Sequence, residues 1–415
     1  MTNKLYYFLI LILCLTSCKT ENKIEGNFLK KSQTEKIDTL VNRYHNLNRF
    51  NGVILVFHDN SIIYDKSFGL ADYENNRPFS NKTTFKIGKL SELITARIIH
   101  GMAENNKFQL SDRISKYLPE IDSDLTINDL LNHQTNLPSI ESLKEEYPDL
   151  KYSTIEYANL SNVSSTRSED SELDYNILGE LIENISNKSF QENVTDLSEK
   201  VGLENTYFEK KDSSLAVGYL YHNYRGDGLE LQTSPQYNPV TRFSSQGIKS
   251  TPYDLKKIID LNSDNKLDIQ GYLQNDGFSY SVINNPETNI CIIVLSNFRH
   301  PVGGEIANSI SAIIENEEYN LPLERKRVEI DKSLLKDYSG LYSLNEQVDL
   351  EVIDENDSLF VMMGPNKIHL IPQSSNQFFM EQMDASMRFL RNKEGLVNEV
   401  VLLDGFLEGN KIERK

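Results

Sequence analysis

The sequence has few cysteines, and its few histidines show no metal-binding pattern. Cys14, Cys18 and Cys291 are the three cysteines among 415 residues. The first two lie at the N-terminus, so Cys291 alone belongs to the folded body and an internal disulfide is excluded. Cys291 lies in an apolar run, where we expect a small apolar side chain and not a catalytic thiol. The seven histidines are scattered without ligand spacing, so we expect no metal and no cofactor.

Positive charge and long apolar runs are also scarce. The chain has 43 Lys and Arg against 61 Asp and Glu, a formal net charge of −18. Nucleic acid requires a clustered basic surface, so we expect no nucleic-acid partner. No run is long enough for a transmembrane helix.

The N-terminus has the pattern of a secretory signal. Lys4 precedes an apolar run from Leu5 to Leu15, which is too short to span a membrane in the mature protein. Leu15, Thr16, Ser17 and Cys18 follow in an order that resembles a bacterial lipobox. That resemblance implies a signal peptide over residues 1–18 and lipidation of Cys18. It also implies a lipid anchor at a membrane of the bacterial cell envelope, facing the periplasm or the surface. The alternative is an ordinary signal peptide that ends near a cysteine.

The chain is long enough for two folded domains. Residues 19–33 indicate a polar tether and residues 317–331 a charged linker. Between them, residues 34–316 have β-rich hairpins near both ends and helical patterns in the middle, which predicts a mixed first domain. Residues 332–415 have short apolar runs between closely spaced turn signals, which predicts an antiparallel barrel or sandwich.

Several blocks resemble the serine β-lactamase and penicillin-binding-protein-like family, in particular the class C β-lactamase-related serine hydrolases. The blocks are Phe68 to Pro78, Thr84 to Gly88, Leu110 to Pro119, Leu125 to Pro138, Gly179 to Glu183, Ala216 to Tyr219, Gly247 to Thr251 and Ile293 to Asn297. Their shared order makes the match specific. The resemblance implies an α+β fold, a β-lactamase/transpeptidase-like domain whose antiparallel sheet is flanked by helices. The C-terminal segment resembles the small lipocalin-like β-barrel that often follows this domain.

The first catalytic motif of this family is Ser-x-x-Lys, at the start of a helix directly after Phe-x-x-Gly. Spacing of three places both side chains on one helix face. Here Lys89 stands where the resemblance places the nucleophile, and Glu92 where it places the activating lysine. Ser91 is a weak substitute, because it lies about 200° around the helix from position 89. A packing role is its simpler interpretation.

The other two motifs are also altered. Tyr-x-Asn should precede Gly179 by nine residues, where Asp170 to Glu172 stand instead. The start of Lys-Thr-Gly or His-x-Gly falls on Gly271, and no cation follows before Gly277. The short segment before Gly277 indicates that a neighbouring strand and loops have been deleted.

Literal matches to these motifs occur elsewhere, and we interpret them as chance. They are Tyr157 to Asn159, Ser333 to Lys336 and Lys249 to Thr251. His133 is interpreted as part of a structural segment.

The replaced positions predict a pocket in which Lys89 is surrounded by Glu92, Asp170 and Glu172. Lys89 and Glu92 are i and i+3, so an ion pair is expected. A ligand carboxylate would meet repulsion of about 1 to 4 kcal/mol per close charge, so penicillin and D-Ala-D-Ala are not expected to bind. A metal site built from the three acids is the alternative.

The leading hypothesis is a catalytically inactive envelope lipoprotein of this family that binds a ligand or partner, with a cell-wall component or small molecule as the ligand. One rival is an esterase, amidase or peptidase with a relocated nucleophile, for which Ser91 is the candidate. The other is a ligand-binding C-terminal barrel on a scaffold domain.

Overall fold

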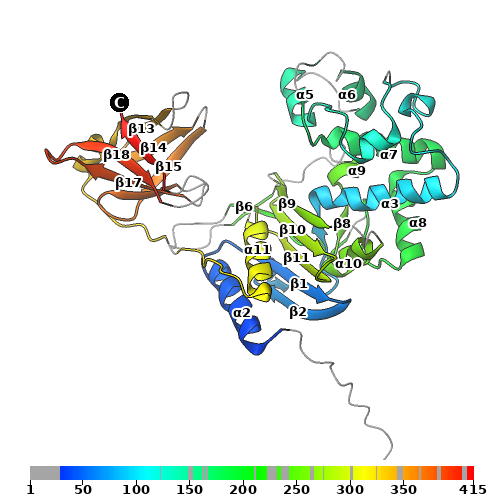
Figure 1. Cartoon of the computed structure of the whole chain (residues 1–415), viewed down its shortest axis with the longest axis horizontal. Helices are drawn as coiled ribbons and strands as arrows, with labels where there is room; N and C mark the ends of the chain where they lie inside the picture. Colours follow the sequence, from blue (N-terminus) through cyan, green and yellow to red (C-terminus); the bar gives the residue numbers. More distant parts are fainter. Residues whose placement is uncertain are drawn as a thin grey trace, which may run out of the picture.

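The computed structural model of the chain describes two folded bodies (Figure 1). The described residues are 29–121, 123–147, 153–160, 164, 167–209, 212–221, 231–234, 243–261, 266–273, 275–299, 302–323, 325–343, 349–363, 366–380, 385–403 and 409–415. The first body runs from α2 (Lys31–Asn46) to α11 (Val302–Glu315), and the second follows it. Cys18 and its signal-like segment lie outside these ranges. Within them, no helix has the length and hydropathy needed to cross a membrane.

An antiparallel sheet forms the centre of the first body. In order across it, the described strands are β2 (Ser61–Phe68), β1 (Gly52–His58), β11 (Ile290–Ser296), β10 (Phe278–Asn285) and β9 (Leu267–Leu273). All seven residues of the central strand β11 are buried, which explains its continuous apolar run. Burial raises the pKa of the Cys291 thiol in this strand to about 12, so the thiolate that would act as a nucleophile is scarce at neutral pH.

Helices cover both faces of the sheet. On one face, α2 and α11 pack through a core that contains Ile37, Leu40, Ile306 and Ile310. On the other face, a larger apolar cluster joins the sheet to four longer helices. These are α3 (Ser91–Glu104), α7 (Glu172–Ser186), α8 (Phe190–Val201) and α10 (Pro252–Asp260).

Shorter elements complete the described part of the first body. They are β3 (Leu70–Asp72), β4 (Arg77–Pro78), β5 (Phe85–Lys86), η1 (Gly88–Leu90), η2 (Ile114–Lys116), α4 (Ile127–Leu131), α5 (Ile140–Glu146), α6 (Thr154–Leu160), β6 (Tyr219–Tyr221), β7 (Gln232–Thr233), α9 (Phe243–Gln246) and β8 (Lys249–Ser250). Ser171 caps α7, because its side chain accepts a hydrogen bond from the backbone N–H of Leu173. This cap fixes where α7 begins and so places Asp170 immediately before the helix.

The second body is a closed antiparallel barrel. It comprises η4 (Lys332–Leu334), α12 (Leu335–Tyr338), β12 (Gly340–Ser343), β13 (Asp349–Glu355), β14 (Ser358–Met363), β15 (Asn366–Pro372), β16 (Gln377–Met380), β17 (Ser386–Arg391), β18 (Val397–Leu402) and β19 (Lys411–Arg414). Tyr338, Tyr342 and Phe378 surround Phe389, with ring centroids 4.6, 5.8 and 5.6 Å from its own. Buried side chains therefore fill this interior, as they can in small barrels.

The α+β fold class and the antiparallel C-terminal barrel predicted from the sequence are confirmed. The predicted loss of a strand beside Gly277 is wrong. β9 is present and pairs with β10, from Leu267 opposite Asn284 to Leu273 opposite Phe278. Polar and apolar residues alternate along β9, and it is a half-exposed edge strand. Such a strand lacks the apolar run that marks its buried neighbours. Helix α2 begins at Lys31, inside the segment that the sequence indicated as a tether.

The barrel interior gives a stability prediction. Phe389→Ala should lower the free energy of unfolding by about 3 to 5 kcal/mol, because the truncation removes a buried ring and leaves a cavity. Leu396→Ala is the matched control, since Leu396 is 65% exposed. Denaturant unfolding followed by tyrosine circular dichroism measures both. Equal stability of the two variants would contradict the packed interior.

Candidate functional site

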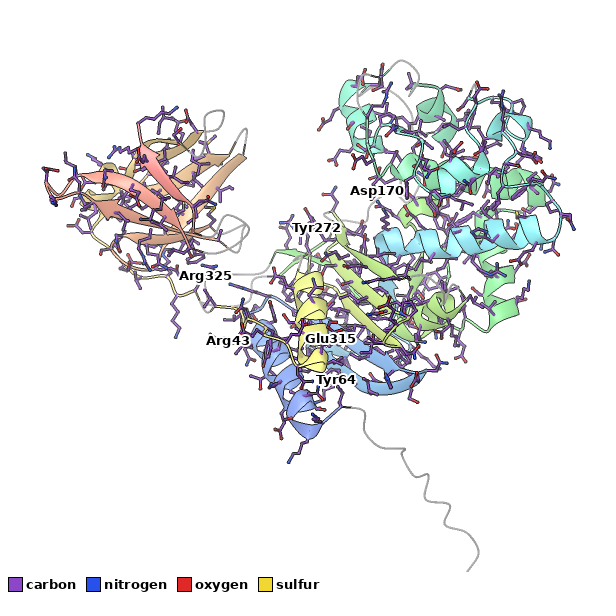
Figure 2. The ribbon with its side chains drawn as sticks, in the orientation of Figure 1. Arg43, Tyr64, Asp170, Tyr272, Glu315 and Arg325 are labelled. Atoms are coloured by element: carbon purple, nitrogen blue, oxygen red, sulfur yellow. The ribbon has the colours of Figure 1, made fainter. Side chains whose placement is uncertain are left out.

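The start of α3 holds the position at which the family resemblance places its nucleophile. One 3-10 turn, η1, leads into the helix and carries Lys89. The Lys89 ammonium forms an ion pair with the Asp170 carboxylate and lies 4.0 Å from Glu92 Oε2. Asp170, labelled in Figure 2, lies in the segment that leads into α7. Two of the three acids expected around Lys89 are therefore in contact with it.

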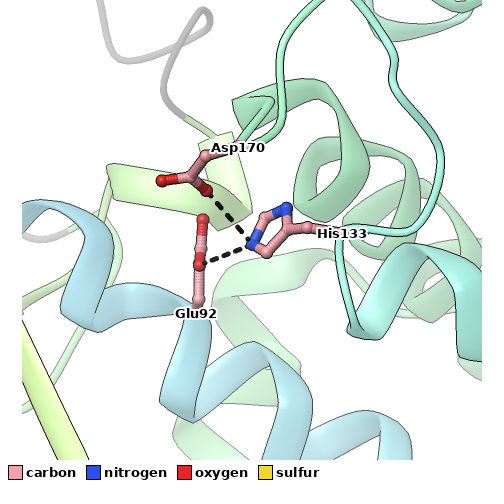
Figure 3. Close-up of side chains that lie close together, drawn as sticks. All are labelled: Glu92, His133 and Asp170. Carbon is pink, nitrogen blue, oxygen red and sulfur yellow. Dashed lines mark hydrogen bonds and ion pairs between the residues drawn. The ribbon is translucent and has the colours of Figure 1, made fainter.

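Glu92 extends this group into the interior. Its side chain is only 9% exposed, and its Oε2 lies 3.3 Å from His133 Nε2. The same Nε2 lies 3.4 Å from Asp170 Oδ1, so one ring nitrogen of His133 contacts both carboxylates (Figure 3). Burial raises the pKa of Glu92, against the opposing effects of the His133 hydrogen bond and the Lys89 charge.

His133 is held in place from its other side. It follows α4 with a positive φ of 52°, and its Nδ1 lies 2.8 Å from Oδ2 of Asp174, which is 1% exposed. Thr135 Oγ1 donates to Asp174 Oδ1 over 2.5 Å. Burial disfavours a charged ring, but the hydrogen bonds to Asp174 and Glu92 outweigh it and raise the pKa of His133 to about 9. The imidazole is therefore mostly protonated at neutral pH.

The Tyr280 side chain fills the space beside Lys89. Its hydroxyl oxygen accepts a hydrogen bond from the backbone N–H of Lys89, 3.1 Å away. Gly88 has φ +53°, and a Cβ there would lie 2.3 Å from Tyr280 Cε1. A Cβ at Gly271 would lie 2.6 Å from the tyrosine hydroxyl oxygen. The positive φ and the Tyr280 ring favour glycine at position 88, and a side chain at position 271 would displace the Tyr280 hydroxyl. The N–H at the nucleophile position is already bonded within the protein.

The remaining residues singled out in the sequence lie apart from this group. Ser91 is 0% exposed, and its Oγ accepts a hydrogen bond from the backbone N–H of Ile248 over 3.1 Å. Glu172 Oε2 instead accepts a hydrogen bond from the backbone N–H of Ile140 over 3.4 Å. Gly271 lies on the edge strand β9, beneath the tyrosine ring.

The literal motif matches occupy ordinary structural positions. Asn159 on α6 donates to the carbonyl oxygen of Glu120. Ser333 and Lys336 lie at the entrance of the barrel, in η4 and α12. Lys249 Nζ donates to the carbonyl oxygen of Phe208 over 2.5 Å. Burial lowers the pKa of Lys249 to about 8, with a contribution from the nearby Lys86 charge.

Three residues of the group were not identified from the sequence. His133 and Asp174 meet because the loop after α4 packs on the first turn of α7, and no local spacing connects them. Tyr280 belongs to an apolar strand in which it looks like any core residue. Gly88 and Gly271 were the available sequence signal for Tyr280. Two glycines on neighbouring segments leave space that a large side chain from a third segment can fill.

Chemically, this group can hold charges, and neither the Ser91 nor the Thr135 hydroxyl is placed to attack a substrate at its centre. Position 89 carries an ammonium, and Ser91 is enclosed away from solvent. The Thr135 hydroxyl is bonded on both sides, because it donates to Asp174 and accepts from the backbone N–H of Leu137 over 3.2 Å. The three carboxylates of Glu92, Asp170 and Asp174 surround the two basic groups of Lys89 and His133.

The elevated pKa of His133 gives a pH prediction. His133→Gln should lower the free energy of unfolding by about 1.5 to 3 kcal/mol at pH 6, the range for hydrogen bonds to charged groups. Because the folded-state pKa is raised, the stabilisation is complete below the unfolded-state pKa of about 6.5. It is lost as the pH rises through about 9. Denaturant unfolding from pH 6 to 10 measures the difference.

His58→Gln, at the last residue of β1, is the control for a general histidine effect. If the difference in free energy of unfolding between the wild type and His133→Gln stayed constant across this pH range, a protonated His133 at neutral pH would be contradicted.

Comparisons with known proteins agree with this architecture. Residues 37–272 match the family model described as Beta-lactamase. A teichoic acid D-alanine hydrolase of Staphylococcus aureus is 25% identical over 237 residues, which are 55% of this chain and 57% of that protein. The chain thus matches little more than half the length of this curated relative.

Solved structures share the fold. The octameric penicillin-binding protein homologue from Pyrococcus abyssi has a TM-score of 0.57 and 19% identity, covering 92% of this chain and 100% of that one. FmtA from Staphylococcus aureus has a TM-score of 0.56 and 19% identity, covering 72% of this chain and 93% of that one. Because the Beta-lactamase family model matches more than half of this chain, the chain belongs to the Beta-lactamase family.

Proposed function

We propose that this chain is a non-catalytic member of the Beta-lactamase family that binds a ligand or partner at the bacterial cell envelope. The observation that carries the proposal is the Lys89 ammonium at the nucleophile position, paired with Asp170 and close to Glu92. An ammonium in an ion pair has no lone pair with which to attack a carbonyl. Glu92, in the place of the activating lysine, is a buried acid bonded to His133.

The backbone around Lys89 supports the same conclusion. Acyl transfer requires N–H donors aimed at the position of the developing oxyanion. The N–H of Lys89 is instead bonded to the Tyr280 hydroxyl, so one donor at this position would have to break that bond to serve a substrate. The ring of Tyr280 also fills the space next to Gly271.

We further propose a cell-wall component as the ligand. The curated relative is named for hydrolysis of D-alanine on teichoic acid, and a family domain that has lost the reaction can keep a surface for a related polymer. Lys89 and His133 are already matched by carboxylates, so the group has no positive excess to attract the carboxylate of penicillin. His133 also offsets part of the repulsion that the sequence alone suggested.

The rival hypotheses receive less support. A relocated nucleophile at Ser91 would require a base and access to substrate, but its side chain is fully buried and bonded to a backbone N–H. A ligand inside the barrel would have to displace the aromatic cluster around Phe389. A small pocket in the barrel body, lined by Ile330, Leu359 and Phe378 among others, is a place that the barrel hypothesis retains.

The absence of catalysis is tested with a broad serine-hydrolase probe. Intact-mass measurement after treatment with a fluorophosphonate or a β-lactam should show no added mass on the wild type or on Ser91→Ala. The teichoic acid D-alanine hydrolase of Staphylococcus aureus serves as the positive control. An adduct on the wild type that disappears in Ser91→Ala would establish the relocated nucleophile and overturn the proposal.

The envelope anchor is tested in cells. Wild-type chain should partition into the detergent phase and carry the mass of a lipid on Cys18, because acyl chains hold a protein on a membrane. Cys18→Ser should abolish the lipid mass and move the protein to the aqueous phase, and Cys14→Ser is the matched control. Unchanged partitioning of Cys18→Ser would contradict the anchor.

A further inference from the structure

We infer that Glu92, His133 and Asp170 form a binding site for a divalent transition-metal ion of the Zn²⁺ type, next to Lys89, where the family resemblance places the nucleophile. This inference goes beyond the proposed function and does not depend on which ligand the protein binds. It also departs from the sequence, which led us to expect no metal and offered Glu172 as the third acid of the alternative site.

The donor atoms have the spacing of metal ligands. One carboxylate oxygen of Glu92, one of Asp170 and a ring nitrogen of His133 lie within 4.8 Å of one another. His133 Nε2 is 3.3 Å from Glu92 Oε2 and 3.4 Å from Asp170 Oδ1. Ligands at about 2.0 to 2.2 Å from a tetrahedral zinc ion are separated by about 3.4 Å. The two distances at His133 therefore need almost no adjustment to accept a metal.

The support behind His133 is that of a metal-bound histidine. Asp174 Oδ2 lies 2.8 Å from Nδ1, so Nδ1 carries a proton in that hydrogen bond and Nε2 is the nitrogen directed at the two carboxylates. Metal-binding histidines commonly donate their second ring N–H to a carboxylate, which fixes the orientation of the ring. Asp174 is held in turn by Thr135 Oγ1. This buried carboxylate lies outside the set of metal donors, so it is a separate observation that points to the same site.

Lys89 shows that these carboxylates already hold a cation. Its ammonium is paired with Asp170 and lies 4.0 Å from Glu92 Oε2. A metal ion must displace it, and the lysine side chain can leave because it is 29% exposed and has a flexible stem. His133 Nε2 releases its proton to solvent when it bonds to the metal. The lysine and the metal ion are therefore alternative cations at one site.

The ligand set favours a borderline transition metal. Imidazole suits zinc, copper, iron and nickel, whereas sites for magnesium and calcium are built from oxygen. One imidazole and two carboxylates leave a fourth position open at the side vacated by Lys89. Structural zinc sites have four protein ligands, so this site should bind zinc reversibly.

The test is calorimetric titration of the metal-free full chain with ZnCl₂ at pH 8, with Co²⁺ absorption as a second readout of coordination. We expect one Zn²⁺ per chain, with affinity at least 100-fold weaker in His133→Gln and Glu92→Gln. Asp174→Asn should weaken binding about 10- to 100-fold although it does not touch the metal. His100→Gln on α3 is the histidine control and should bind as the wild type does.

Lys89→Met separates metal binding from folding defects. Removal of the competing ammonium should strengthen Zn²⁺ binding several-fold, and a misfolded variant cannot produce this gain. The inference is overturned if the wild type shows no saturation at 1 mM Zn²⁺, whatever the behaviour of Lys89→Met. It is also overturned if His133→Gln binds with unchanged affinity.

Discussion

The ion pair between Lys89 and Asp170 determines how the rest of the site is arranged. It joins the first turn before α3 to the segment before α7. Once an ammonium occupies position 89, the acid at Glu92 has a positive neighbour, and His133 supplies a second one. A buried carboxylate without such partners would be costly. The residues at positions 89, 92 and 170 therefore form one consistent set, because the Lys89 ammonium lies close to both carboxylates and offsets their charge.

The fold is retained because the residues that build it are separate from those that carried the chemistry. The central strand β11 uses mainly apolar side chains, and the N-caps of α7 and α8 use the hydroxyls of Ser171 and Ser189. Gly88 and Gly271 both lie against the Tyr280 side chain, which leaves little room for a Cβ at either position. The backbone of the family fold is therefore compatible with a lysine at position 89. Function has to be argued from the site and not from the fold.

Much of the fold could be predicted from the sequence. Local periodicity predicted the hairpins, the helices and an antiparallel barrel or sandwich, because buried strands and amphipathic helices have characteristic spacings of apolar residues. The choice of a barrel came from the family resemblance. Edge strand β9 was not predicted, because about half of its residues face solvent and it lacks a continuous apolar run. Of the site, Lys89, Glu92 and Asp170 followed from motif positions. His133, Asp174 and Tyr280 did not, because their proximity depends on how a loop and a strand pack in three dimensions.

The central claim is that the nucleophile position holds a paired lysine and that no acyl group can be attached there. A crystal structure of the chain soaked with a β-lactam tests it most directly. The account predicts continuous density for Lys89 against Asp170, the Tyr280 hydroxyl at the Lys89 N–H, and no covalent adduct. An acyl group bonded to a side chain at the start of α3, with the lysine displaced, would contradict it.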